Sequence, residues 1–293
     1  MPTVSTIEQF LTALQTAADG SIIELANDLD FNNWIPRDSQ TYPIHVPSDA
    51  TQLGDLTING NGHTIYNLAN FRPSAGSSLF YLHVLVSGID HIKFNNINFL
   101  NVACTNDDVP LFSSNFNSGA SAETHPISFN DCTIQGVFNS PFGNSVYFAR
   151  CMMTMQSSRN AIESQFNNRK PYYYMCWIWL KDVIKWNNNP FLTHLDTCYV
   201  QGQKTQQAAN TNNTYFTNCI NSCINFTANI TQSTPALSSV VQAAAGITKI
   251  NIVNTDHLTG TAASTSTAVI GVTDEQMKNA QYLFDIGFDI LPT

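Results

Sequence analysis

Few residues in this sequence have the type and spacing that catalysis requires. Cleavage of a glycosidic bond by an acid/base pair needs two carboxyl groups about 5–10 Å apart, and a calcium-dependent lyase needs several acids with a basic residue as proton acceptor. The only local trio that could do either is Arg159, Glu163 and Asp182. Lys185 could neutralise Glu163, so surface ion pairs explain the trio better. We therefore expect no catalytic residues, with Arg159, Glu163 and Asp182 as the alternative.

The histidines and cysteines do not suggest a metal centre either. The seven histidines include no pair at the spacing of a metal site or a catalytic triad. Cys219 and Cys223 are the closest cysteine pair, and no second pair matches them. Structural zinc sites use two closely spaced ligand pairs such as C-x-x-C. We therefore expect neither a metal ion nor another cofactor.

A short repeated pattern must position whatever function the chain has. It consists of an apolar or aromatic residue, two further residues, a small apolar residue, one further residue and another apolar residue. It occurs at 94–99, 129–134, 148–153, 173–178, 195–200 and, shortened, at 216–219. Five of the seven cysteines hold the same place in it: Cys132, Cys151, Cys176, Cys198 and Cys219. Their spacings of 19, 25, 22 and 21 residues indicate stacked coils of chain.

The apolar residues within each repeat alternate, as Ile92 and Phe94 and then Ile97 and Phe99 show. Alternation is the period of a β-strand, and the two polar residues between the pairs predict a bend. Each repeat is then one rung, and equivalent residues of successive rungs stack about 4.8 Å apart. Because free cysteine behaves as a small hydrophobe, we expect the five cysteines to form a buried, reduced core ladder.

The stretch 86–101, with the sequence VSGIDHIKFNNINFLN, resembles the rungs of pectate-lyase-like right-handed β-helices. The resemblance implies an all-β, right-handed parallel β-helix, and the superfamily contains lyases, hydrolases, phage tailspikes and passive virion proteins. Its members often carry an asparagine ladder at the bend, here Asn96. This chain departs from that ladder, because the bend positions read Asn96, Asp131, Arg150, Met175, Thr197 and Asn218. Asp131 and Arg150 should approach each other as a salt bridge.

The chain is expected to form one elongated domain with protected ends. Residues 1–20 predict a capping helix with Ser5 as N-cap and Glu8 three residues later. Residues 21–272 form the β-helix, with loop excursions at 30–52 and 101–125. Residues 273–293 predict a closing helix and a tail. Helices over the open ends prevent edge-to-edge pairing of the outermost strands.

Charge and hydropathy exclude several classes of partner. The formal net charge is −9, with 12 Lys and Arg against 21 Asp and Glu, which disfavours nucleic acid and anionic membranes. No apolar run is long enough to span a bilayer, so no membrane insertion is expected. Charged residues make up only 11% of the chain, so Asn, Thr, Ser and Gln must cover its surface. Such a surface suits assembly or weak contact with sugars.

The outward positions next to the cysteines are more informative. They should be polar if water covers them, yet with Trp179 they form an apolar strip: Met152, Trp177, Trp179, Tyr199 and Ile220. An exposed apolar strip marks an interface. Cover by a loop of the same chain and a platform for stacking sugars are the alternatives. We expect a homo-oligomer, with a trimer as the first guess.

Two classes of function fit these features. The first is a non-enzymatic bacteriophage virion protein, such as an appendage, fibre, spike or decoration subunit. It would be made in the host cytoplasm, contact other virion proteins and act in assembly or in attachment to a host-surface glycan. The alternative is an extracellular polysaccharide-degrading enzyme, a lyase or depolymerase tailspike, with a site completed between subunits.

Overall fold

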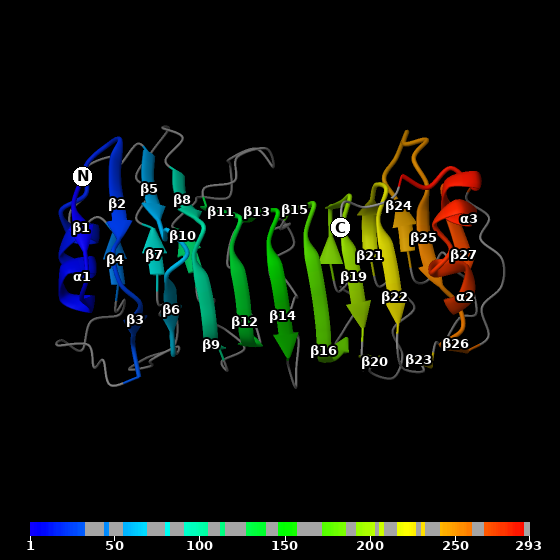
Figure 1. Ribbon diagram of the computed structural model, residues 1–293, viewed down its shortest axis with the longest axis horizontal. Coiled ribbons are helices and arrows are strands. Elements are labelled where there is room, and N and C mark those ends of the chain that lie inside the picture. The colour runs from blue at the N-terminus through cyan, green and yellow to red at the C-terminus, as the bar shows by residue number, and fades with distance from the viewer. Residues whose placement is uncertain are drawn as a thin grey trace. The chain divides into compact units, whose positions relative to one another are not determined.

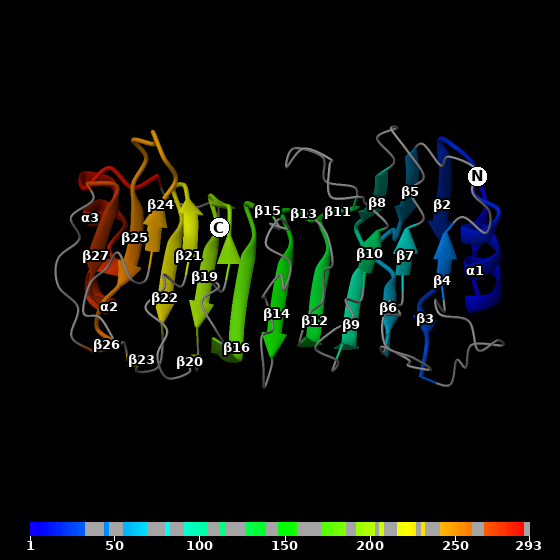
Figure 2. The same cartoon turned by 180° about the vertical axis from the view of Figure 1, so that it is seen from behind.

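The computed structural model describes β-strands along the chain and helices near both of its ends (Figures 1 and 2). The described residues are 1–32, 44–46, 55–68, 80–82, 91–104, 112–114, 127–138, 146–156, 172–185, 192–202, 205–207, 216–226, 230–231, 241–259 and 267–289. The chain divides into two compact units. The first contains Met1–Met152 and Ser164–Pro171, and the second contains Met153–Glu163 and Tyr172–Thr293. Each unit is described by itself.

Three parallel sheets build the first unit. The first sheet has the order β1 (Thr3–Val4), β2 (Ser21–Leu25), β5 (Asp55–Asn59), β8 (His91–Asn95), β11 (Ile127–Asn130), β13 (Val146–Ala149). The second has the order β3 (Leu29–Asp30), β6 (Thr64–Tyr66), β9 (Asn98–Cys104), β12 (Thr133–Phe138). The third has the order β4 (Ile44–Val46), β7 (Phe80–Leu82), β10 (Phe112–Ser114). The chain visits the sheets in turn, which is the topology of a parallel β-helix. Strands β4 and β10 lie within the two segments predicted as loop excursions.

The interior of the first unit is a stack of aromatic rings. Phe94, Phe129 and Phe148 occupy the same register position of β8, β11 and β13. Their ring centroids are 4.9 and 5.2 Å apart, and all three side chains are buried. The polar residues between them on the same strands point the other way, as the predicted alternation requires.

Helix α1 (Ile7–Gln15) lies at the N-terminal end of the first unit (Figure 1). Its N-cap is Thr6 and not Ser5: the Thr6 hydroxyl accepts a hydrogen bond from the backbone of Gln9, and the Gln9 side chain accepts one from the backbone of Ser5. The capping pair is therefore shifted by one residue from the prediction. The helix buries Phe10 and Leu14.

The second unit is also built from parallel strands. Its largest sheet has the order β14 (Met152–Gln156), β16 (Trp177–Lys185), β19 (Tyr199–Gly202), β22 (Cys223–Phe226), β25 (Asn251–Asn254), β27 (Val269–Val272). Strand β15 (Tyr172–Tyr174) pairs with β18 (Leu195–Asp196), and β20 (Thr205–Gln207) pairs with β16. The remaining strands are β17 (Leu192–Thr193), β21 (Phe216–Cys219) and β24 (Val241–Ala243), then β23 (Ile230–Thr231) and β26 (Leu258–Thr259).

Two short helices follow the last strand in place of the single closing helix expected. They are α2 (Asp274–Met277), which begins with a capping box between Thr273 and Gln276, and α3 (Ala280–Asp285), whose N-cap is Asn279. No helix in the described ranges is long and apolar enough to cross a membrane. The predicted all-β parallel β-helix with an N-terminal capping helix and a short C-terminal helical segment is confirmed.

The predicted bends are single residues in the left-handed conformation. Asn96, Asp131, Arg150, Met175 and Thr197 have φ between 51° and 55°. Asn and Asp adopt this conformation readily, whereas other side chains pay roughly 1–2 kcal/mol. Arg150, Met175 and Thr197 nevertheless adopt the left-handed conformation, because each rung needs it to turn at the bend.

The asparagine ladder exists, but it lies one position before the bend. In the first unit Asn130 donates to Asn95, Asn95 donates to Asn59, and Asn59 donates to the carboxylate of Glu24. The three distances are 3.0, 3.0 and 2.8 Å. We call these four residues the amide ladder. The sequence places two asparagines side by side at 95 and 96, and the bend uses the second while the ladder uses the first.

The final predicted repeat is misaligned by three residues. The neighbour of Tyr199 across the sheet is Cys223, and the backbone N–H of Cys198 donates to the Ser222 hydroxyl at 3.2 Å. Ser222 therefore holds the rung position that was assigned to Cys219. The cause is a second left-handed residue: Asn218 and Asn221 have φ of 55° and 44°, so the bend comes later than the sequence pattern indicated.

Candidate functional site

The alternative catalytic trio falls on residues whose side chains the structure does not describe. Arg159 and Glu163 lie outside the described residues, and Asp182 lies on β16 without a described side chain. Within the ranges that are described, no three His, Cys, Asp or Glu side chains are arranged to hold a metal ion. The candidate site described below consists of outward-facing residues.

The core cysteines are packing residues in both units. Cys132 and Cys151 are buried in the first unit, and Cys176, Cys198 and Cys219 are buried in the second. All five are free thiols. The Cys151 thiol and burial raise the pKa of Cys132, and burial raises that of Cys219, so these groups stay protonated. A protonated buried thiol is a poor nucleophile, which leaves the cysteines a structural role.

The predicted salt bridge between Asp131 and Arg150 is confirmed in the first unit. Two guanidinium nitrogens of Arg150 donate to the two carboxylate oxygens of Asp131, each at 2.7 Å. The hydrogen bonds from Arg150 lower the pKa of Asp131. About half of each side chain is exposed, so the pair contributes at most about 1 kcal/mol.

The most unusual feature of the second unit is a pair of exposed tryptophans on β16. Strand alternation places Ile178 and Leu180 fully inside, with 0% exposure, and turns Trp177 and Trp179 outward. Trp177 is 55% exposed and Trp179 is 36% exposed. The buried residues on either side fix the backbone beneath the indoles. We call Trp177 and Trp179 the aromatic face.

The aromatic face begins a column of outward apolar residues. Trp177 pairs in register with Tyr199, Tyr199 with Cys223, Cys223 with Ile252, and Ile252 with Ile270. The Trp177 and Tyr199 rings meet edge to face, with centroids 5.6 Å apart and planes at 84°. A β-sheet that faced water would carry polar residues at these positions. The column therefore differs from a sheet face that only water covers.

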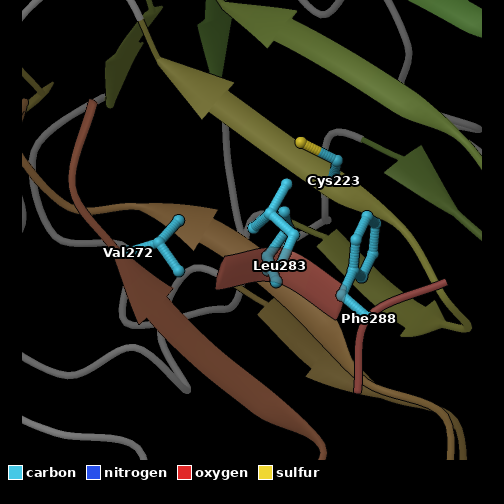
Figure 3. Packing of buried hydrophobic residues seen from close by; sticks show 5 residues of the cluster. Cys223, Val272, Leu283 and Phe288 are labelled. Carbon is cyan, nitrogen blue, oxygen red and sulfur yellow. The ribbon is translucent and has the colours of Figure 1, made fainter. Parts of the chain in front are cut away.

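The C-terminal segment of the same chain covers the far part of this column. We call the buried residues there the cap cluster: Cys223, Ile252, Val272, Leu283 and Phe288 (Figure 3). Met277 of α2 brings its sulfur to 3.4 Å from that of Cys223, and burial raises the pKa of Cys223 to about 12. Tyr199 packs against the edge of the cluster, whereas the two tryptophans stay exposed. Cover by the same chain, one of the sequence alternatives, holds for part of the column.

One predicted member of the strip does not lie in this column. Ile220 bridges to Asp196 one position before the late bend, so Cys223 occupies the place predicted for it. The prediction for Ile220 is wrong because the bend moved by three residues. Met152, another predicted member, is 54% exposed as an outward residue of the first unit, where its backbone N–H donates to the backbone carbonyl of Cys132.

Polar groups border the aromatic face on the same side of the sheet. Gln201 lies beside Trp179 in register, and Lys181 follows Trp179 by two residues on β16 and is exposed. Asn225 donates to the Tyr199 hydroxyl at 2.8 Å and holds that ring in place. The site therefore consists of two indoles bordered by the Tyr199 phenol, two amides and one cation, without an acid on the described part of this strand face.

Comparison with known proteins identifies the first part of the chain. Residues 2–168, more than half of the sequence, match the family described as "Putative pectate lyase-like adhesive domain". The chain belongs to this adhesive-domain family. Among solved structures it is similar to "a putative immunoglobulin A1 protease from Bacteroides ovatus", with a TM-score of 0.41, 12% identity, and 97% of this chain and 87% of that chain covered. No curated protein matches.

The adhesive-domain match ends before β16. It includes the amide ladder, the salt bridge of Asp131 and Arg150, and Met152, whereas the aromatic face lies in the residues that follow. The family assignment therefore covers the scaffold of the first unit. The exposed tryptophans are a feature of the residues beyond it.

Proposed function

We propose that this protein is a non-enzymatic attachment protein whose copies associate through the aromatic face. The exposed Trp177 and Trp179, fixed over a fully buried strand interior, carry the proposal. The adhesive-domain family supports a role in attachment. We place the protein in a bacteriophage particle, as an appendage, fibre, spike or decoration subunit, because the rungs resemble those of a superfamily that includes phage tailspikes and virion proteins, and because the polar surface has few charges.

Burial of the aromatic face would release substantial free energy. The exposed fractions of Trp177 and Trp179 correspond to about 200 Å² of side-chain surface, since a tryptophan buries up to about 250 Å². At about 25 cal/mol per Å² this is worth about 5 kcal/mol. Association itself costs about 4–15 kcal/mol, so the tryptophans can anchor an interface but need further contacts around them.

Assembly and attachment support each other in this proposal. A single neutral polar surface binds a cell-surface glycan weakly. When several copies are held together, the second and later contacts become intramolecular, and overall binding can exceed the single contact by about 10²–10⁴-fold. An assembled β-helix would thus attach firmly through individually weak contacts.

Sedimentation velocity over a concentration series tests the proposal. The wild-type protein should form oligomers, and the double variant Trp177→Ser, Trp179→Ser should sediment as a monomer with an unchanged β-sheet spectrum. Tyr174→Ser is the matched control, because Tyr174 is an outward aromatic residue beside the buried Tyr173 on β15. A wild-type protein that stays monomeric at high concentration would refute assembly through this face. Release of reducing ends or unsaturated sugars from polysaccharide would instead support the enzymatic alternative.

A further inference from the structure

Helix α3 presents a further exposed aromatic residue in the same unit. Phe284 is 69% exposed, more than either tryptophan of the aromatic face. Its neighbour Leu283 is buried in the cap cluster, so α3 is fixed on the sheet with Phe284 on its outer side. Gln281, Phe284 and Asp285 follow the i, i+3, i+4 spacing that places them on one helix face. The Gln281 amide donates to the Asp285 carboxylate at 2.7 Å, which orients the acid.

We infer that α3 of a second copy covers the aromatic face, with Phe284 on the indoles and Asp285 paired with Lys181. This inference rests on the proposed function and names the element that the partner copy contributes. The aromatic face with Lys181 and the outer side of α3 carry complementary groups in the same order along the chain. On β16, two exposed aromatic residues are followed by an exposed cation, and on α3 an exposed aromatic residue is followed by an exposed acid.

Charge makes this match specific. The chain carries 12 Lys and Arg against 21 Asp and Glu, so the net negative charge of two copies opposes their association unless a cation lies at the contact. Lys181 is a cation two residues from Trp179, on the same side of the strand. An acid next to an exposed aromatic residue is its natural complement, and Asp285 beside Phe284 supplies one.

The contact must form between copies and not within one chain. Leu283 and Phe288 hold α3 and its following residues over Cys223 and Ile252, and β19 lies between β22 and β16 in the sheet. Figure 3 shows Leu283 and Phe288 directed at the sheet beside Cys223. Two different patches make the interface heterologous, so each copy both donates α3 and accepts it. Such contacts close into rings or extend as filaments, and a three-membered ring agrees with the expected trimer.

A mixing experiment tests the inference with the full chain. Phe284→Ser keeps the aromatic face and loses the contact residue of α3. The double variant Trp177→Ser, Trp179→Ser keeps α3 intact and loses the aromatic face. Each variant alone should be monomeric, with self-association at least about 100-fold weaker than in the wild type. Mixed in equal amounts they should form a 1:1 heterodimer that cannot grow further, because only one intact contact is available.

Charge exchange provides an independent measurement. Lys181→Asp and Asp285→Lys should each weaken self-association by about tenfold or more, and the double exchange should restore most of it. Glu275→Lys is the matched control, since Glu275 is an exposed acid on α2 outside the α3 face. Circular dichroism of each variant verifies folding.

The outcomes separate this inference from the proposed function. If the wild type associates through Trp177 and Trp179 but the two variants do not complement each other, α3 is not the partner element and assembly through the aromatic face stands. If the wild type is monomeric, both fail. If a neutral oligosaccharide shields the tryptophans of a monomer from iodide quenching, the face binds sugar and the inference is overturned.

Discussion

The amide ladder of the first unit allows a quantitative prediction about stability. Asn95 lies in its middle, donating to Asn59 and accepting from Asn130, both at 3.0 Å between partly buried side chains. Replacing Asn95 by Ala removes both hydrogen bonds and leaves an acceptor on Asn59 and a donor on Asn130 without their partners. Each lost bond costs about 1 kcal/mol, and a partly buried group left unsatisfied adds to that. We expect Asn95→Ala to lower the free energy of unfolding by about 2–3 kcal/mol.

A matched asparagine on the next strand provides the control. Asn98 donates one exposed hydrogen bond, to the backbone carbonyl of Gly62 at 2.9 Å, and belongs to no ladder. Asn98→Ala changes the same atoms and should cost only about 0.5–1 kcal/mol. Helix or strand propensity alone would make the two substitutions similar. The difference between them therefore isolates the ladder.

Urea unfolding of the wild type and both variants, followed by far-ultraviolet circular dichroism, measures this difference. A midpoint shift with an unchanged slope reports stability and not a change in the surface exposed. A difference of 2 kcal/mol is well outside the extrapolation error when midpoints are compared directly. Equal shifts for Asn95→Ala and Asn98→Ala would show that water satisfies the ladder amides as well as their neighbours do, and the reasoning would be wrong.

Three further predictions concern single residues. Gly60→Ala should cost at least about 3 kcal/mol of stability or prevent folding, because the new Cβ would lie 2.3 Å from the backbone oxygen of Asn96. The Cβ of Gly62→Ala meets nothing within 4 Å, so this variant should lose only about 1–2 kcal/mol through left-handed backbone strain. Thermal unfolding of the two variants measures the difference. Cys176→Asp should abolish soluble expression, because it buries an unpaired charge in the core, whereas Cys176→Ala should not. The salt bridge with Arg150 stabilises the folded protein above the ordinary pKa of an aspartate, and this contribution is lost as the pH falls through the lowered pKa of Asp131. Arg150→Ala removes the contribution, so the free energies of unfolding of wild type and variant should differ at neutral pH and converge at low pH.

The sequence was sufficient for the rungs because side-chain alternation and the cysteine positions are local signals. It predicted the salt bridge of Asp131 and Arg150 for the same reason, since both residues hold the bend position of successive rungs. It could not place the amide ladder, because Asn95 and Asn96 are adjacent and identical in type. Only the φ of Asn96 decides which of them bends and which stacks.

The last repeat shows where a local signal misleads. Phe216 and Cys219 have the spacing of the earlier repeats, but Asn218 and Asn221 both adopt the left-handed conformation, and Ser222 then takes the inner position. Ser222 succeeds there because its hydroxyl donates to the carbonyl of Ile220 at 2.9 Å and Asn251 accepts from its backbone N–H at 2.9 Å. These partners are distant in sequence or invisible to an apolar pattern, so the shift could not be foreseen.

The position of the cap cluster explains why the aromatic face is a candidate for contact and not an unfinished core. The apolar column is shielded by α2 and α3 from Ile270 to Cys223, and Tyr199 lies at the boundary, packed on the cluster on one side and on Trp177 on the other. Beyond that boundary lie Trp177, the largest side chain of the column, and Trp179, two residues further along β16. Strand structure does not require them, since a small polar residue would satisfy the same outward positions. Burial against a partner is the proposed reason for the two indoles, and the exposed Phe284 of α3 is the group that we infer contacts them.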